Sequence, residues 1–226
     1  MKILALDTAT ELCSAALWID GASVSRQSER PRAAGELILG MIAQLLAESG
    51  LTLTQLDLIA FGRGPGAFTG VRLAVAVAQG LGFAAGLPLL AVSDLRALAQ
   101  QAFTQLGAPR RALICQDARM AEVYWGCFEC TDSAREVTVE AVAAPASVRV
   151  PAAWLGGSVC GAGSGFEAYP SLGASSGVEL APVWGYLRPR ALEIAQLAAQ
   201  EGLSQAVLPE SAQPVYLRDE VATPPS

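Results

Sequence analysis

The sequence contains no histidine, and Lys2 is its only lysine. Without histidine neither a Ser-His-Asp triad nor a Cys-His pair can form, so the sequence gives little support to nucleophilic catalysis. Lys and Arg together number 15 against 21 Asp and Glu, the net charge is −6, and Arg110-Arg111 is the densest basic pair. Because clustered positive charge supplies most of the affinity for nucleic acids, we expect the chain alone not to bind RNA.

Cysteine is also sparse, with five residues scattered along the chain. An odd, scattered set does not predict a disulfide framework. Cys127 and Cys130 have CxxC spacing, but three residues apart on a strand they point to opposite faces, so we expect no zinc site. No apolar span reaches the roughly 20 residues of a membrane helix without breaks, and MKILALDTAT does not resemble a signal peptide. We therefore expect a cytoplasmic protein without a membrane partner.

The pattern of apolar residues predicts two similar halves within the 226 residues, which are 52% hydrophobic. An apolar strand ending in Asp7 and a hairpin begin the first half, and an apolar strand ending in Asp117 and a hairpin begin the second. In each half helices and strands then alternate. This order predicts an α/β fold of two duplicated lobes, each a mixed sheet flanked by helices. We expect the lobes to span 1–107 and 108–226, with the final helix packing back and a mobile tail at 219–226.

The individual elements follow from periodicity and from turn residues. Strands are predicted at 3–7, 12–19, 22–28, 56–61, 89–92, 112–116, 122–129, 135–142 and 155–160. Helices are predicted at 36–49, 70–85, 93–106 and 190–200. Ser93 is the expected N-cap of the third of these helices.

The chain is organised around the stretch FGRGPGAFTGVRLAVAVAQGLGFAAG, residues 61–86. Its glycine-rich loop leads into the helix 70–85, for which Thr69 is a plausible N-cap. This helix is apolar nearly all round, which predicts burial on more than one side. Its small residues form rows four apart, Ala74-Ala78-Gly82 and Ala76-Gly80-Ala84, and small residues allow a second helix to approach closely. We expect the chain's own sheet on one side and another helix, from this chain or a second one, on the other.

Two places offer residues for chemistry. Asp7, Thr8 and Thr10 lie at a strand end, where an Asp and hydroxyl groups can hold Mg²⁺ and phosphate. The alternative is that they satisfy a turn. The glycine loop can cradle an anion at a helix start, but it matches neither the P-loop nor GxGxxG, because Val71-Arg72 follows Gly70 and Ala67 replaces a glycine. The alternative there is tight packing of helix on sheet.

Four stretches, ILALDTATELCSAAL, FGRGPGAFTGVRLAVAVAQGLGFAAGLPLLAVS, DARMAEVYWG and PVYLRD, resemble the TsaB (YeaZ) family of the bacterial threonylcarbamoyl-adenosine tRNA modification pathway. The resemblance implies the actin/Hsp70/sugar-kinase (ASKHA) fold. The related transferase TsaD holds a metal through His-x-x-x-His on the helix that corresponds to 93–106. The matching positions here are Asp94 and Leu98, and leucine cannot bind a metal. The resemblance therefore implies a non-catalytic paralogue without a metal site or a required cofactor, with at most a vestigial ATP/Mg site at Asp7, Thr8 and Thr10.

The resemblance also implies partners. Such chains dimerise with themselves or with TsaD through the first two helices, here 36–49 and 70–85, and the ATPase TsaE joins the pair. Transfer RNA is reached only through the complex. Many relatives carry a His-Ser pair before the first helix, where this chain has Ala34-Gly35. The alternative is an autonomous ATP-binding kinase or ATPase. The predicted interface residues are Ile38, Met41, Ile42, Leu45, Val71, Ala74, Ala78, Leu81 and Gly82.

Overall fold

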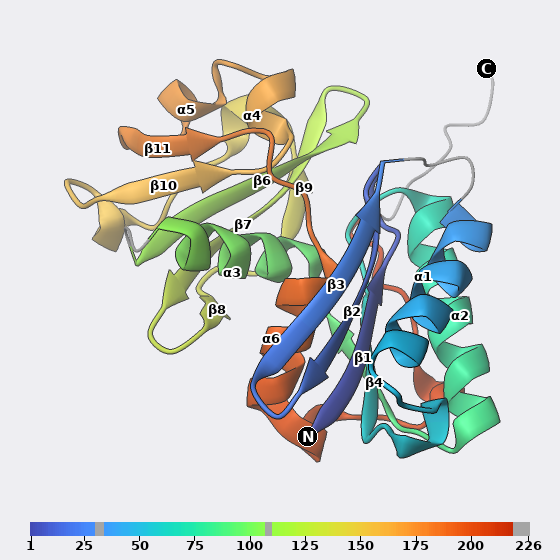
Figure 1. Cartoon of the computed structure of the whole chain (residues 1–226). Helices are drawn as coiled ribbons and strands as arrows, with labels where there is room; N and C mark the ends of the chain where they lie inside the picture. The colour runs from blue at the N-terminus through green and yellow to red at the C-terminus, as the bar shows by residue number, and fades with distance from the viewer. Residues whose placement is uncertain (30–33, 107–109, 219–226) are drawn as a thin grey trace, which may run out of the picture.

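The computed structural model describes residues 1–29, 34–106 and 110–218, which form two mixed sheets flanked by helices (Figure 1). The first sheet has the order β3-β2-β1-β4-β5. Its strands are β1 (Lys2–Asp7), β2 (Cys13–Ile19), β3 (Ala22–Ser28), β4 (Leu58–Gly62) and β5 (Leu89–Val92). β1, β2 and β3 form an antiparallel meander, and β4 and β5 run parallel to β1.

The second sheet repeats this topology. Its order is β11-β10-β6-β7-β8, with β9 also paired to β7. The strands are β6 (Arg111–Arg119), β7 (Glu122–Cys130), β8 (Ala134–Glu136), β9 (Ala141–Ala143), β10 (Val159–Ala162) and β11 (Leu180–Trp184). β7 runs antiparallel to β6, to β8 and to β9, whereas β10 and β11 run parallel to β6. The predicted α/β duplication is confirmed.

Two helices, α1 (Ala34–Glu48) and α2 (Phe68–Ala85), cover one face of the first sheet (Figure 1). Their apolar stripes pack with Leu4, Leu6 and Phe61 of the sheet into one core cluster. Gly86, with φ of 67°, ends α2, as a left-handed residue commonly does at a helix C-terminus.

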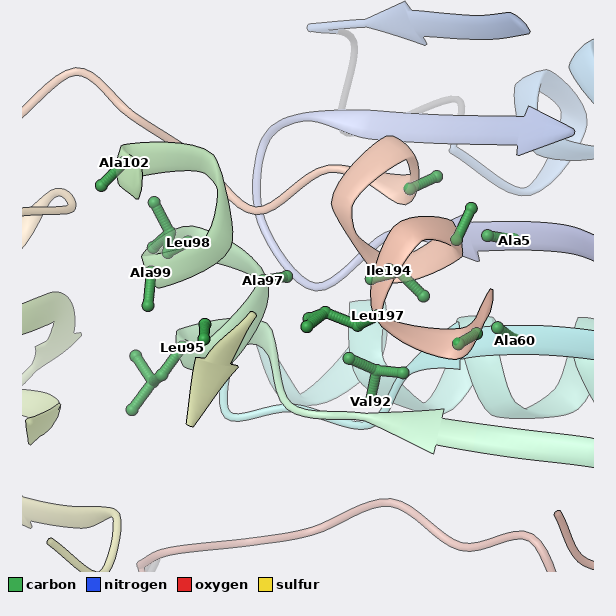
Figure 2. Packing of buried hydrophobic residues seen from close by; sticks show 14 of the residues in the cluster. Ala5, Ala60, Val92, Leu95, Ala97, Leu98, Ala99, Ala102, Ile194 and Leu197 are labelled. Atoms are coloured by element: carbon green, nitrogen blue, oxygen red, sulfur yellow. The ribbon is translucent and has the colours of Figure 1, made fainter. Parts of the chain in front are cut away.

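The other face of the first sheet is covered by α6 (Ala191–Glu201), and α3 (Asp94–Leu106) lies beside α6, toward the second sheet (Figure 1). In Figure 2, Ile194 and Leu197 of α6 lie against Ala5, Ala60 and Val92. The same core cluster contains residues of α3 and of β6, so the two sheets share one hydrophobic core. Ser93 caps α3 as predicted, since its hydroxyl accepts a hydrogen bond of 3.2 Å from the backbone N–H of Arg96.

Short elements complete the chain. The helices α4 (Gly165–Ala168) and α5 (Leu172–Ser175) cover the outer face of the second sheet, where Leu172 packs with Leu113 and Trp154. The 3-10 turns are Leu53–Gln55, Pro145–Ser147, Ala152–Trp154, Gly202–Gln205 and Pro209–Ser211.

Several predicted boundaries need correction. The strand predicted at 135–142 is two short strands, β8 and β9, because residues 137–140 leave the sheet. The strand predicted at 155–160 begins only at Val159, after a 3-10 turn, and both β11 and the helices α4 and α5 were missed. Such short elements carry too few residues for a periodic signal. The predicted lobe boundary and the predicted mobile tail lie outside the described residues.

Residues 212–218 form an extended segment, here called the strap, that follows the last 3-10 turn. Gln79 of α2 donates to the carbonyl of Ala212 (3.1 Å), and the N–H of Val215 donates to the carbonyl of Arg63 (2.8 Å). Arg218, at the end of the strap, donates to the carbonyl of Ala118 on β6 (3.2 Å). The strap therefore connects α2 of the first lobe to β6 of the second.

Candidate functional site

A cleft of about 790 Å³ lies between the two lobes. The turn after β1 and the glycine loop before α2 form one wall, and the ends of β6 and α4 form the opposite wall. Strap residues 215–218 also line it. The candidate residues predicted from sequence lie on the first wall. The strap follows them by more than 140 residues, so no local pattern indicates that it lines the same cleft.

Asp7 does not face this cleft. Its side chain is fully buried at the end of β1, where it accepts a hydrogen bond from the backbone N–H of Ala9 (2.9 Å). Its neighbour is Asp94, the fully buried first residue of α3. Gly62 lies between the two carboxyls, and a Cβ at this position would be 2.6 Å from an oxygen of each. Only glycine fits between the two carboxyl groups.

The two carboxyls form a coupled pair. Burial raises the pKa of Asp7 from 3.8 to about 6, against hydrogen bonds from Ala9, Asp94 and Thr8 that lower it. Burial, together with the charge of Asp7, raises the pKa of Asp94 well above its usual value. Asp94 also binds the glycine loop through two hydrogen bonds. Its carboxyl accepts one from the N–H of Gly64 (2.5 Å), and its backbone N–H donates one to the Gly64 carbonyl (3.0 Å). The pair fixes the loop rather than presenting charge to the cleft.

Thr8 is buried as well, and its hydroxyl donates to the carbonyl of Gly70 (2.6 Å). A Cβ on Gly70 would be 2.0 Å from the Thr8 carbonyl oxygen, so α2 and the turn after β1 are in backbone contact. This geometry favours the packing interpretation of the glycine loop. Of the predicted triplet, Thr10 alone lines the cleft. The three side chains of the possible vestigial nucleotide site are therefore not brought together in the cleft.

The second lobe contributes charged and amide groups to the cleft. Asp117, the counterpart of Asp7, accepts the N–H of Arg119 (2.8 Å) and pairs with its guanidinium (2.9 Å). Arg188 forms ion pairs with Glu11 and Glu167 across the cleft. The amide of Gln116, 3% exposed, has no hydrogen-bond partner among the described residues.

These residues do not fit a Mg²⁺-bound nucleotide. Asp7, the carboxyl that the sequence offers for Mg²⁺, is held away from the cleft, and the carboxylates that do line it, Glu11, Asp117 and Glu167, are each paired with an arginine.

The positions that correspond to the TsaD metal pair are both inside the fold. Leu98 is fully buried in the core between the sheets, where Figure 2 shows it on α3. Asp94 contacts Asp7 and the glycine loop, as described above. Across the described ranges, no group of three or more His, Cys, Asp or Glu residues is arranged to hold a metal ion.

The predicted interface residues lie on the wrong side of their helices for contact with a second chain. Most of them are buried on the side of the first sheet within this chain: Ile38, Met41, Ile42, Leu45, Ala74, Ala78 and Gly82, with Leu81 half-buried. Val71 is buried beside the glycine loop. A Cβ on Gly82 would be 2.9 Å from the Leu89 side chain. The row Ala74-Ala78-Gly82 thus packs on the sheet. A helix that is apolar all round does not reveal from sequence which of its rows faces inward.

The other row of α2 is exposed. Phe68, Arg72, Ala76, Gly80 and Ala84, spaced four apart, are called the outer row here, and all are exposed. The adjacent Phe83 is 61% exposed. Helix α1 also exposes small and apolar residues on the side away from its buried stripe, Leu39, Gly40 and Ala43. An exposed, largely apolar surface of small residues, called the outer face below, is typical of a protein interaction site.

The same surface gives α2 the composition of a membrane span. It has 18 residues and a mean hydropathy of 1.4, and 28% of it is buried within the chain. Among the described helices it alone meets these criteria of length and composition. Because its inner row packs on the sheet, its exposed apolar side calls for a partner surface rather than a lipid environment on all sides.

The repeated mixed sheets around a cleft are those of an actin/Hsp70/sugar-kinase-type α/β protein. Residues 29–158 match the family model described as TsaD: tRNA N6-adenosine threonylcarbamoyltransferase. The tRNA threonylcarbamoyladenosine biosynthesis protein TsaB of Escherichia coli (strain K12) is 42% identical over 98% of this chain and 96% of its own length. TsaB of Haemophilus influenzae is 48% identical over 55% of this chain and 52% of its own.

A solved structure of YeaZ from Pseudomonas aeruginosa superposes with a TM-score of 0.86 and 43% identity, covering 96% of this chain and 99% of that one. A second Pseudomonas aeruginosa structure, described as a protein with similarity to peptidase YeaZ, gives 0.87 with the same identity and coverage. The chain belongs to the TsaB (YeaZ) family, and so to the machinery of tRNA threonylcarbamoyladenosine biosynthesis.

Proposed function

We propose that this chain is a non-catalytic, cytoplasmic scaffold subunit that pairs with a TsaD-type transferase through the outer face of α1 and α2. The observation that carries the proposal is the exposed outer row. Added Cβ atoms on Gly80 and Gly40 would meet nothing within 4 Å, so both helices offer a small-residue surface open to a partner helix. Two helices from each chain would bury it as a four-helix bundle.

The residues at the two positions that correspond to the TsaD metal pair support a non-catalytic role. Leu98 has no group that binds a metal, and Asp94 is committed to the Asp7 pair and the glycine loop. In the cleft, the arginines that line it are engaged by carboxylates: Arg188 by Glu11 and Glu167, for instance. We infer that the chain acts by positioning its partner, that TsaE joins the assembled pair, and that tRNA is reached through the transferase. Alone, the chain would cover the outer face with a second copy.

The test is co-purification with the TsaD-type protein encoded in the same genome, followed by sizing and a titration of affinity. Gly80→Arg places a long cation in the middle of the outer row without entering the core, and we expect it to stay folded and to lose the complex. Gly173→Arg is the matched control, because a Cβ at this second-lobe glycine also meets nothing within 4 Å. Wild-type affinity in both variants would contradict the proposed surface.

A modification assay tests the role itself. If the chain is a scaffold, the transferase should depend on it for multiple turnover, and Gly80→Arg should reduce modification in parallel with complex formation. A transferase that turns over equally well without this chain would refute the proposal, even if the two proteins form a complex.

A further inference from the structure

Arg72 is the only strongly charged residue of the outer row, and its guanidinium is held by aromatic side chains. Its guanidinium carbon lies 3.8 Å from the ring centroid of Phe68 and 5.8 Å from that of Tyr216. The two rings are 5.5 Å apart. Both distances to Arg72 are within the range of a cation–π interaction. The guanidinium is thus fixed at the N-terminal end of the row.

The hydrogen bonding of Arg72 leaves one edge of the guanidinium open. Its Nε donates to the Tyr216 hydroxyl at 2.7 Å, and no hydrogen bond from Nη1 or Nη2 to a described residue is formed. No described carboxylate forms an ion pair with it, in contrast to Arg63, Arg188 and Arg218. The two Nη groups form the fork that binds a carboxylate with two parallel hydrogen bonds.

The strap explains why this arginine is fixed in advance. Tyr216 reaches α2 because Val215 is hydrogen-bonded to Arg63 and Arg218 is anchored on β6. A long side chain that is ordered before binding loses less conformational entropy when the partner arrives. A free arginine elsewhere on the surface would not have this advantage.

We propose that Arg72 is the specificity-determining contact of the outer face and binds an Asp or Glu carboxylate on the partner helix of the TsaD-type transferase. This inference rests on the proposed function. Charge complementarity identifies the occupant: the outer row offers small apolar residues along its length and one open cation at its Phe68 end. The partner helix therefore has small residues facing Ala76 and Gly80 and an acidic residue facing Arg72. Phe68, 50% exposed, and Tyr216, 44% exposed, shield that ion pair from water.

The experiment measures the dissociation constant of the complex with the TsaD-type protein at several salt concentrations. Arg72→Gln should weaken binding by at least about tenfold and flatten its dependence on salt, because a charge pair is lost. The dissociation constant of Arg72→Lys should lie between those of wild type and Arg72→Gln, since an ammonium keeps the charge but cannot form the two parallel hydrogen bonds. Tyr216→Phe keeps the ring, removes the hydroxyl that orients Nε, and should weaken binding by a few-fold.

Arg149→Gln is the matched control. Arg149 is an exposed second-lobe arginine whose guanidinium contacts backbone carbonyls of its own segment, at Ala146 and Val148. It should bind as wild type. All variants should melt within a few degrees of wild type, so that loss of binding is not loss of fold.

Unchanged affinity and salt dependence in Arg72→Gln would overturn this inference. If Gly80→Arg abolishes the complex and Arg72→Gln does not, docking through the outer face is supported and the role of Arg72 is refuted. If wild type does not bind at all, the proposed function fails first. Loss of self-association in Arg72→Gln with unchanged affinity for the transferase would assign the carboxylate to a second copy and also overturn the inference.

Discussion

The buried pair of Asp7 and Asp94 predicts that the protein loses stability as pH rises through neutrality. Both carboxyls have a raised pKa in the folded chain, so the folded state retains protons that the unfolded state has already released. A group of this kind stabilises the fold fully below its unfolded pKa, and the contribution disappears as pH rises through the folded pKa. Stability should therefore be higher at pH 5 than at pH 8.

The size of the effect follows from the shift of Asp7. A rise in pKa from 3.8 to about 6 corresponds to about 3 kcal/mol over the whole range. About half of this contribution, on the order of 1 kcal/mol, is lost from the free energy of unfolding between pH 5 and pH 8. Asp94 adds to this loss, because its pKa is raised further by burial and by Asp7 and Glu140. Glu140 also has a raised pKa through burial, opposed by Ser93 and Arg63, and contributes in the same direction.

Asp94→Asn isolates the pair. Asparagine keeps an oxygen for the Gly64 N–H, cannot ionise, and offers an N–H to the Asp7 carboxylate. We expect the variant to be more stable than wild type at pH 8 and to lose less stability between pH 5 and pH 8. The burial of Glu140 contributes to both chains, so the difference between them reports the ionisation of Asp94 and its coupling to Asp7 and Glu140.

The measurement is urea unfolding at four pH values from 5 to 8, with wild type, Asp94→Asn and the exposed control Asp132→Asn. The control should follow wild type. A wild-type stability that is flat from pH 5 to pH 8, or an Asp94→Asn variant that falls as steeply as wild type, would refute the reasoning.

Two further predictions concern the glycine loop and the cleft. Gly70→Ala should lower the free energy of unfolding by at least about 2 kcal/mol, because its Cβ would overlap the Thr8 carbonyl, whereas Gly40→Ala should raise it by about 0.5–1 kcal/mol in thermal unfolding. Equal effects of the two changes would contradict the packing interpretation. Titration with ATP and Mg²⁺ should show no saturable binding by calorimetry, because Asp7 is held away from the cleft; micromolar binding that Asp7→Asn abolishes would instead support the ATPase alternative.

The periodicity of apolar residues and the positions of turn residues are sufficient to predict the two-lobed architecture. The strand–hairpin–alternation pattern predicted both lobes, because each sheet begins with an apolar strand that has an aspartate at or near its end, Asp7 at the end of β1 and Asp117 two residues before the end of β6. The helix start at Thr69 was wrong by two residues. The N-cap is Ala67, whose N–H donates to the Ala9 carbonyl at 2.7 Å, so a tertiary backbone contact sets the boundary in place of a side-chain cap.

The candidate sites were harder to predict, since they depend on which face of an element is turned inward. Asp7 and Asp94 are 87 positions apart, and nothing in either local pattern indicates that they meet across Gly62. The choice between Ala78 and Gly80 as an exposed position was equally undetermined, because both rows of α2 are small and apolar. Tertiary packing decides such cases, whereas local propensity does not.

The position of α6 has a consequence for synthesis on the ribosome. All strands of the first sheet emerge within the first 92 residues, but the apolar face formed by Ile3, Ala5 and Ala60 is covered by residues 191–201. One face of the first sheet therefore remains uncovered during synthesis until residues 191–201 have been made. A nascent chain of this kind exposes an aggregation-prone surface for several seconds at ordinary elongation rates. Folding of the two lobes is completed together, by the last helix, rather than one lobe after the other.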